Sequence, residues 1–184
     1  MAGVPPVCDF GWKAPAFTLP GTDGKTRSLA DIKGANGTLI VFMCNHCPFV
    51  VHILPEFVAF AKEYMARGVN VLAISSNDVE GYPMDGPEHM KALAERLDFG
   101  FPYLYDESQE VAQAYEAACT PDFSIFDANQ RCVYRGQFDG ARPGNDVPVT
   151  GHDMRQALDT LLSGGAVSEE GQTPSLGCNI KWKA

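Results

Sequence analysis

The segment TLIVFMCNHCP, residues 38–48, decides the fold that the sequence predicts. It begins with a continuous apolar run of strand length, which is typical of a strand buried on both faces of a sheet. Between residues 50 and 65, apolar side chains recur every three or four positions, which predicts an amphipathic helix that ends at Gly68. Two cysteines, Cys44 and Cys47, therefore lie at a junction between a buried strand and a helix.

The rest of the chain alternates strand and helix patterns. Residues 14–29 predict a β-hairpin around the turn sequence GTDG. Further along, the patterns predict a buried strand at 69–76, helices at 86–100, 108–118 and 151–164, a β-hairpin at 122–136, and a tail without clear periodicity at 164–184. Because strands that alternate with helices pair in parallel, we expect one α/β domain over residues 1–184, a three-layer sandwich with an antiparallel edge.

Charge and composition argue against several classes of function. The 184 residues carry a net charge of −9, and so acidic a surface repels phosphate backbones and anionic lipids, so no nucleic-acid or membrane partner is expected. No apolar run approaches the roughly 20 residues that span a bilayer. The N-terminal residues lack the basic and apolar segments of a secretory signal, which favours a cytoplasmic location.

The close cysteine pair is the strongest chemical signal. Of six cysteines, only Cys44 and Cys47 lie close in sequence. We expect Cys44 at or just before the N-terminus of the helix, where free N–H groups and the helix dipole stabilise a thiolate. A spacing of three residues would put both sulfurs on one face, within disulfide distance. Asn45 and His46 lie between them and would tune the pair, because a protonated His46 favours the thiolate and makes the disulfide more oxidising.

Two other interpretations of the pair remain open. Both thiols could simply pack in the core. The pair could instead be half of a zinc or copper site, but no third and fourth ligand converge on it in the sequence. His46 and His52 differ by about 240° on a helix, and the other histidines are isolated. We therefore expect no bound metal.

Five segments together resemble the thioredoxin superfamily, and within it the redoxin branch of peroxiredoxins and alkyl-hydroperoxide-reductase/thiol-specific-antioxidant proteins. They are residues 11–34 (N-terminal extension), 38–48 (strand and active-site turn), 101–127 (the segment leading to a Thr-Pro strand), and 134–145 and 176–183, which look characteristic of a narrower peroxiredoxin-like subgroup with CxxC. The resemblance covers nearly the whole chain. It implies a thioredoxin-like sandwich with an N-terminal β-hairpin extension and a C-terminal tail, and no organic cofactor.

The resemblance also implies roles for individual residues. Cys44 matches both the attacking cysteine of thioredoxins and the peroxidatic cysteine of peroxiredoxins. Cys47 matches the resolving thiol. Thr120 and Pro121 match the pair whose cis-proline faces the active-site disulfide and whose backbone receives a substrate chain.

The sequence departs from both family patterns near the pair. Val41 stands where peroxiredoxins carry a Thr or Ser that holds the peroxide, and Met43 stands where thioredoxins carry Trp. Arg135 is a candidate stand-in for the peroxiredoxin arginine. Cys119, close to the Thr-Pro pair, and Cys178, in the tail, are candidate accessory thiols.

Three hypotheses of function follow. The leading one is a thiol-disulfide oxidoreductase that cycles Cys44 and Cys47 between dithiol and disulfide. The alternative is a thiol-dependent, antioxidant peroxidase in which Cys44 attacks the peroxide. Both act on a disulfide-containing or peroxide substrate and need an external thiol reductant. The lesser alternative is a copper or zinc carrier. Cys8 and Cys132 are expected to be structural.

Overall fold

The centre of the structure is a five-stranded sheet with the strand order β6-β5-β4-β8-β9. The structure is a computed structural model that describes residues 1–6 and 10–184, so Cys8 lies outside the described residues. β4, β5 and β6 are parallel, whereas β8 pairs antiparallel with β4, and β9 pairs antiparallel with β8. The predicted α/β sheet with an antiparallel edge is confirmed. The strands are β4 (Gly37–Phe42), β5 (Val69–Ser75), β6 (Tyr103–Tyr105), β8 (Asp122–Phe126) and β9 (Cys132–Arg135).

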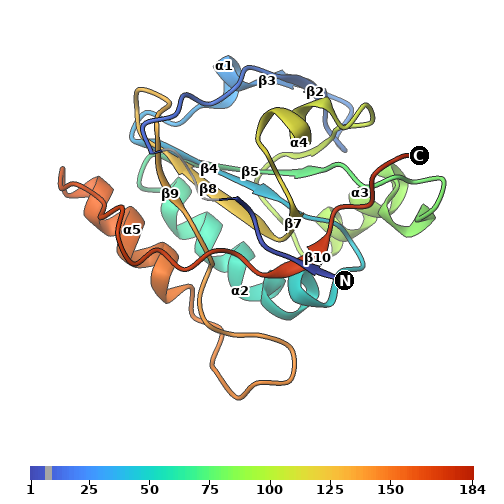
Figure 1. The fold of residues 1–184 in the computed structure, drawn as a ribbon. Coiled ribbons are helices and arrows are strands. Elements are labelled where there is room, and N and C mark those ends of the chain that lie inside the picture. Colours follow the sequence, from blue (N-terminus) through green and yellow to red (C-terminus); the bar gives the residue numbers. More distant parts are fainter. Residues whose placement is uncertain (7–9) are drawn as a thin grey trace.

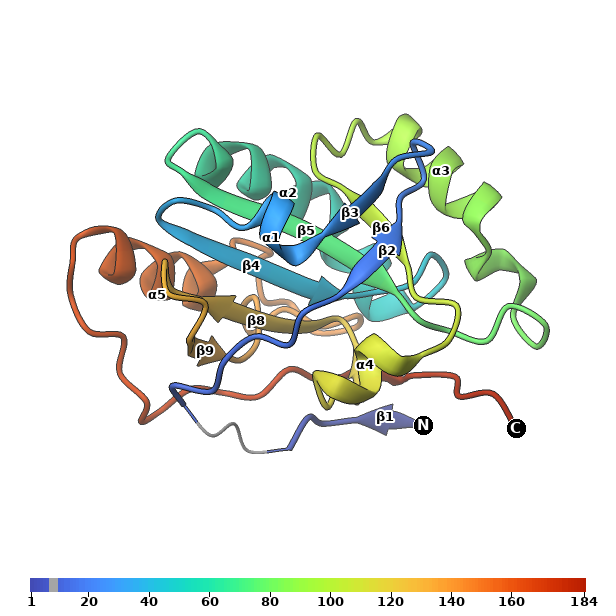
Figure 2. The same ribbon diagram turned by 90° about the horizontal axis from the view of Figure 1, so that it is seen from above.

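Helices and a hairpin cover the two faces of this sheet, as Figure 1 and Figure 2 show. One face carries α2 (Pro48–Met65), α3 (Pro87–Arg96) and α5 (His152–Leu162). The other face carries the hairpin of β2 (Thr18–Pro20) and β3 (Thr26–Ser28), with α1 (Leu29–Ile32) and α4 (Glu110–Ala114). The three layers and the N-terminal hairpin are those that the sequence predicts.

Strand β4 shows why its sequence is a continuous apolar run. Leu39 and Val41 point into the core beneath α2, whereas Ile40 and Phe42 point into the core beneath the hairpin. All four side chains are buried. A strand with an apolar layer on each side has no polar face, so its apolar residues do not alternate with polar ones.

Helix α2 is continuous through Pro55, although proline cannot donate a backbone hydrogen bond. The missing bond would have ended on the carbonyl of Val51, whose residue is 55% exposed and therefore open to water. The proline is tolerated because it falls on the solvent side of the helix.

None of the helices in the described part of the chain has the length and apolar character needed to span a bilayer.

Helix α4 is shorter than the helix predicted at residues 108–118. It begins at Glu110, and its N-cap is Gln109 with a left-handed φ of 65°, rather than Ser108. A second left-handed residue, Glu116 with φ 51°, follows its end. Left-handed residues interrupt a right-handed helix, which limits α4 to little more than one turn.

A second, small sheet was not predicted at all. It has the order β1-β10-β7 and is antiparallel throughout. Its strands are β1 (Ala2–Gly3), β10 (Gly177–Asn179) and β7 (Cys119–Thr120). Figure 1 shows β10 between the N-terminal segment and β7, so the tail folds back over the body. Strands of two or three residues are too short for any periodicity to predict them.

Candidate active site

The CNHC motif lies just before helix α2 rather than inside it. α2 begins at Pro48, and Cys47 is its N-cap. The amides of Val50 and Val51 donate to the carbonyl of Cys47, at 3.0 and 2.9 Å. Cys44 is three residues farther from the helix. Cys44 thus lies just before the helix, whereas Cys47 holds the positive end of the dipole because Pro48 takes the first helical position.

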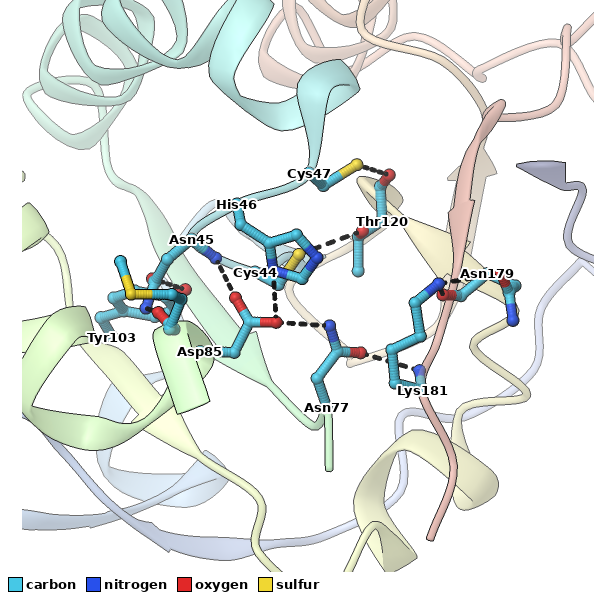
Figure 3. A network of polar contacts seen from close by, with 11 residues as sticks. Cys44, Asn45, His46, Cys47, Asn77, Asp85, Tyr103, Thr120, Asn179 and Lys181 are labelled. Carbon is cyan, nitrogen blue, oxygen red and sulfur yellow. Dashed lines mark hydrogen bonds and ion pairs between the residues drawn. The ribbon is translucent and has the colours of Figure 1, made fainter. Parts of the chain in front are cut away.

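The two sulfurs lie together against the Thr120–Pro121 bond, which is cis, as the resemblance implied. A hydrogen bond joins the Cys44 and Cys47 side chains. The Cys44 sulfur lies 3.6 Å from the Thr120 hydroxyl, and the protonated Cys47 thiol donates to the Thr120 carbonyl at 3.1 Å. Figure 3 shows Thr120 beside the two thiols, with one contact to each sulfur. Residues far apart in sequence therefore form one dithiol site.

The two thiols shift each other's pKa in opposite directions. The pKa of the Cys47 thiol is lowered, above all because the Cys44 thiol donates a hydrogen bond to it, and further by Thr120 and by the thiol and N–H of Cys178. The pKa of the Cys44 thiol is raised by that same shared hydrogen bond, by burial, and by the nearby carboxylate of Asp85. These directions favour Cys47, at the helix terminus, as the acidic thiol, whereas the sequence favoured Cys44, and the assignment stays a prediction.

A buried carboxylate, Asp85, organises the loop between the cysteines. It ends the short 3₁₀ helix η1 (Pro83–Asp85) and is fully buried. It accepts from the Asn45 amide at 2.9 Å and from the Asn77 side chain at 2.9 Å, and it pairs with His46 Nδ1 at 2.7 Å. Figure 3 shows these groups converging on Asp85.

Sequence reasoning missed two members of this network, Asp85 and Asn77. Asn77 follows β5, whose carboxyl end lies beside that of β4, so its position in the sequence could have indicated it. Asp85 lies in an irregular Pro- and Gly-rich segment, and no sequence signal identifies it. Both predicted tuning residues, Asn45 and His46, contact the network, and their effect on the thiols stays a prediction.

Contacts with neighbouring residues fix the side chains of Asn45 and His46. Asn45 donates to the Met84 carbonyl at 2.9 Å and accepts from the buried Tyr103 hydroxyl at 2.8 Å. The His46 ring stacks on Tyr82 with centroids 5.7 Å apart. The loop that carries Cys44 is therefore fixed by side-chain contacts instead of regular secondary structure.

The three accessory candidates separate in space. The Cys178 thiol is hydrogen-bonded to Cys47, so it is part of the site. Cys119 instead donates to the Pro121 carbonyl at 3.5 Å. Burial, together with the nearby carboxylate of Asp122, raises the pKa of the Cys119 thiol. Cys119 is therefore a protonated thiol that packs beside the site.

Arg135 is engaged away from the two sulfurs. Its guanidinium pairs with the buried Asp122 at 3.2 Å and donates to the Glu116 carbonyl at 2.7 Å. Both partners of the ion pair are almost fully buried. These contacts hold the Arg135 guanidinium against Asp122 of β8 and the Glu116 carbonyl.

One set of potential metal ligands occurs at the site, in the part of the chain that the structure describes. One ligand atom each from Cys44, His46 and Asp85 lie within 4.8 Å of one another. Thiolate, imidazole and carboxylate are all zinc ligands. Asp85 supplies the third ligand that the sequence did not reveal, and the expected absence of metal stays a prediction.

Comparison with known proteins finds a relative with a solved structure, and relatives named as a peroxiredoxin and as a thiol-disulfide oxidoreductase. An uncharacterized conserved protein from Geobacillus kaustophilus has a solved structure that is 54% identical, with a TM-score of 0.97, over 100% of this chain and 97% of its own. "Putative peroxiredoxin Rv2521" of Mycobacterium tuberculosis is 32% identical over 107 residues. "Thiol-disulfide oxidoreductase ResA" of Geobacillus thermodenitrificans is 25% identical over 119 residues.

The matched regions differ in extent. The matches span 58% and 65% of this chain, and 63% and 64% of the lengths of the peroxiredoxin and of ResA. Solved thioredoxin-like structures share the fold over most of the chain. Residues 10–135, more than two thirds of the 184, match the sequence pattern of the AhpC/TSA family. This chain therefore belongs to the AhpC/TSA family.

Proposed function

We propose that this protein is a thiol-disulfide oxidoreductase that cycles Cys44 and Cys47 between dithiol and disulfide. The observation that carries the proposal is the hydrogen bond between the two thiols, which face Thr120 together. Two sulfurs in contact need little movement to form a disulfide. A lowered pKa at one of them supplies a thiolate at neutral pH, and the thiolate is the reactive species.

The geometry supports a role for each sulfur. The Cys47 thiolate attacks one sulfur of a substrate disulfide, and the first substrate thiolate leaves with the proton from Cys44. The Cys44 sulfur then attacks Cys47 and releases the second substrate thiolate, which takes a proton from solvent. Two electrons pass from the protein to the substrate, and the Cys44–Cys47 disulfide is formed. An external thiol reductant returns the pair to the dithiol. These roles are the reverse of those the sequence resemblance implies.

The test is to follow the pair in glutathione redox buffers. Protein equilibrated at several ratios of reduced to oxidised glutathione is quenched with acid, alkylated and mapped by mass spectrometry. We expect a Cys44–Cys47 disulfide that forms reversibly, and its loss in Cys44→Ser and in Cys47→Ser. The matched control is Cys132→Ser, which removes a buried thiol in β9 on the opposite side of the sheet. A pair that stays reduced at every ratio contradicts the proposal.

A second candidate function is a thiol-dependent peroxidase with Cys44 as the attacking sulfur. It is favoured by the peroxiredoxin name of one relative and by the Thr120 hydroxyl, 3.6 Å from Cys44. Val41, which the sequence places where a peroxide-holding hydroxyl belongs, packs in the core and offers no hydrogen bond. The Thr120 hydroxyl, which lies near the Cys44 sulfur, is able to donate such a bond to a peroxide.

The peroxidase is tested in Cys47→Ser, where a sulfenic acid at Cys44 has no neighbour to condense with. The measurement is the rate of sulfenic acid formation with hydrogen peroxide, followed by a sulfenic-specific trap. A rate well above that of a simple thiolate, and lost in the matched Cys47→Ser/Thr120→Val variant, makes the peroxidase the leading function. A slow rate that is unchanged by Thr120→Val removes it.

The three potential ligands also favour a zinc or copper carrier as a lesser candidate. Elemental analysis of the reduced protein after incubation with zinc tests it. Carriage of metal predicts one tightly held ion per chain that is lost in Asp85→Asn, because Asp85 is the one carboxylate of the set. No retained zinc after desalting excludes this function for zinc.

A further inference from the structure

The dithiol is closed off from solvent by its own fold. Cys44 is 1% exposed and Cys47 is 0% exposed. A thiol reductant or a substrate disulfide must reach a sulfur atom along its bond axis, so direct reaction at Cys44 or Cys47 requires local opening of the fold. Cys178, in contrast, is partly exposed and lies on the central strand of the small sheet. The thiol closest to solvent at this site therefore comes from the tail.

The register of strand β10 puts Cys178 beside the buried pair. Cys178 stands opposite Thr120 in the antiparallel pairing of β10 with β7. Thr120 is the residue whose hydroxyl and carbonyl contact the two buried sulfurs. The Cys178 thiol and its backbone N–H both hydrogen-bond to the Cys47 sulfur. Three thiols thus form a continuous row from Cys44 through Cys47 to the surface.

The strand is held tightly in this position. A Cβ on Gly177 would lie 1.9 Å from the Thr120 carbonyl, so only glycine permits the close approach of β10 to β7. Beyond β10, the Lys181 amide donates to the Asn77 side chain at 2.9 Å, and Gln109 donates to the Lys181 carbonyl at 2.8 Å. The same Asn77 donates to the carboxylate beneath the CNHC loop, as Figure 3 shows.

We propose that Cys178 is a third redox-active thiol, which forms a disulfide with Cys47 and carries reducing equivalents between solvent and the buried Cys44–Cys47 pair. This inference rests on the proposed disulfide exchange at that pair. The chemical class of external reactant is a small or exposed dithiol, or a disulfide, that can reach Cys178.

Reduction of the oxidised site then takes three exchanges. The Cys178 thiolate attacks the Cys47 sulfur, so the Cys44–Cys47 bond breaks, the Cys47–Cys178 bond forms, and Cys44 takes up a proton. An external thiolate attacks Cys178 and expels Cys47 as a thiolate. A second external thiolate attacks the sulfur of the first and releases Cys178. Two external thiols have then become one disulfide, and the protein has gained the two electrons.

The electrostatics of the row favour the second of these exchanges, whereas the first expels Cys44, whose pKa is raised, and is completed when Cys44 takes up its proton. A disulfide is cleaved more readily when the departing sulfur has the lower pKa. The pKa of the Cys178 thiol is raised, mainly by burial, whereas the pKa of Cys47 is lowered. An external thiolate that attacks Cys178 therefore expels the better leaving group.

The first experiment traps the second disulfide. In Cys44→Ser, Cys47 has lost its neighbour, and limited oxidation with oxidised glutathione should give an intramolecular Cys47–Cys178 disulfide. Trypsin cleaves at lysines and arginines between the two positions, so non-reducing peptide mapping identifies the bond. The matched Cys44→Ser/Cys119→Ser variant should give the same disulfide, because Cys119 bonds to a carbonyl and not to a sulfur. Accumulation of a Cys47–glutathione adduct with Cys178 still reduced would overturn the proposal.

The second experiment measures the relay in the otherwise intact protein. Oxidised wild type, Cys178→Ser and Cys119→Ser are mixed with dithiothreitol, and the loss of the Cys44–Cys47 disulfide is followed by quenched alkylation. We expect Cys178→Ser to be slower by about tenfold or more, since the buried disulfide must then await local opening, and Cys119→Ser to match wild type. Equal or faster reduction of Cys178→Ser overturns the relay and leaves the proposed function intact. Failure of the wild type to form Cys44–Cys47 at all contradicts the proposed function instead.

Discussion

The five-stranded sheet and the three-stranded sheet, here the large and the small sheet, are built by different means. In the large sheet, β4 and β5 are six and seven residues long and lie between two apolar layers. In the small sheet, the strands have two or three residues, and polar contacts of Asn77, Gln109 and Lys181 fix the tail next to it. The active site lies between them. Cys44 follows the large sheet, whereas Thr120 and Cys178 belong to the small one.

This difference indicates that the large sheet determines the stability of the fold, whereas the small sheet controls access to the active site. Burial of apolar area dominates folding free energy, so the large sheet and its helices carry most of the stability. Short strands held by backbone and polar side-chain bonds open at lower free energy. Substitutions in the two regions should therefore have different signatures.

The largest effect is expected from Phe57→Ala, on the face of α2 that packs against the large sheet. Phe57 is 1% exposed, and its ring lies 5.6–6.0 Å from four other phenylalanine rings. Its loss should lower the free energy of unfolding by about 3–5 kcal/mol. Urea denaturation measures this. The control is Val51→Ala on the exposed side of the same helix, expected within about 0.5 kcal/mol of wild type. Similar losses in both would show that burial under α2 does not dominate stability.

Gly177→Ala tests the small sheet. The added Cβ meets the Thr120 carbonyl at 1.9 Å and must push β10 away from β7, at a cost of about 1–3 kcal/mol. The local effect should exceed the global one: faster amide exchange in β10 and faster alkylation of Cys47, with exchange in β4 and β5 little changed. The control is Gly140→Ala, where the nearest atom is 3.8 Å away. A uniform rise in exchange throughout the protein would refute the separation of the two regions.

The same contrast explains which parts of the fold could be predicted. β4, β5 and α2 were predicted because long apolar patterns reflect burial, which is a property of many residues at once. The small sheet could not be, because two-residue strands form only after the termini meet over β7. The sequence placed Pro48 in the first turn and Cys44 at or just before the helix start, but it did not show that Cys47 is the N-cap residue.

Within the site, the sequence indicated the two cysteines and the Thr-Pro pair, because each has a local motif. Asp85 has none, since a buried carboxylate is defined by the partners that satisfy it, here Asn45, His46 and Asn77. Contacts of this kind depend on the tertiary fold. They also shift the pKa values of the two thiols in opposite directions, which no local sequence pattern indicates.

A smaller effect is expected from Asp85→Asn, at the boundary of the two regions. The amide oxygen can still accept from Asn45, so the loop should keep its conformation, but the negative charge near Cys44 is lost. The pKa of the Cys44 thiol should fall by about one unit or more. Ultraviolet thiolate absorbance against pH in Cys47→Ser measures it. The control is Asp98→Asn, an exposed carboxylate paired with Lys62. An unchanged Cys44 pKa would show that Asp85 acts only as a structural acceptor.

The smallest expected effect is the pH dependence of the reduction potential. The pKa of Cys47 is lowered and that of Cys44 is raised, so between these two values the reduced pair holds one proton. Reduction then takes up two electrons and one proton, and the potential should fall by about 30 mV per pH unit, half the slope of two ordinary thiols.

The same pKa shifts determine how the stability of the folded, reduced protein changes with pH. The lowered pKa of Cys47 stabilises the folded, reduced protein fully above the free thiol value of about 8.5, and this stabilisation is lost as pH falls. The raised pKa of Cys44 stabilises it below that value and is lost as pH rises.

The slope is measured by equilibration with glutathione or dithiothreitol between pH 6 and 8, a range of about two units that lies on the acid side of the free thiol value. Titratable groups near the pair include Asp85, His46, Cys178 and Tyr103. The same measurement in His46→Asn and in Cys178→Ser shows whether His46 or Cys178 takes up a proton when the pair is reduced. A slope near 30 mV in all three proteins assigns the single proton to the Cys44–Cys47 hydrogen bond. A slope of about 60 mV in wild type would mean that both thiols are protonated when reduced, and that the helix terminus and the tail strand do not hold a thiolate at Cys47.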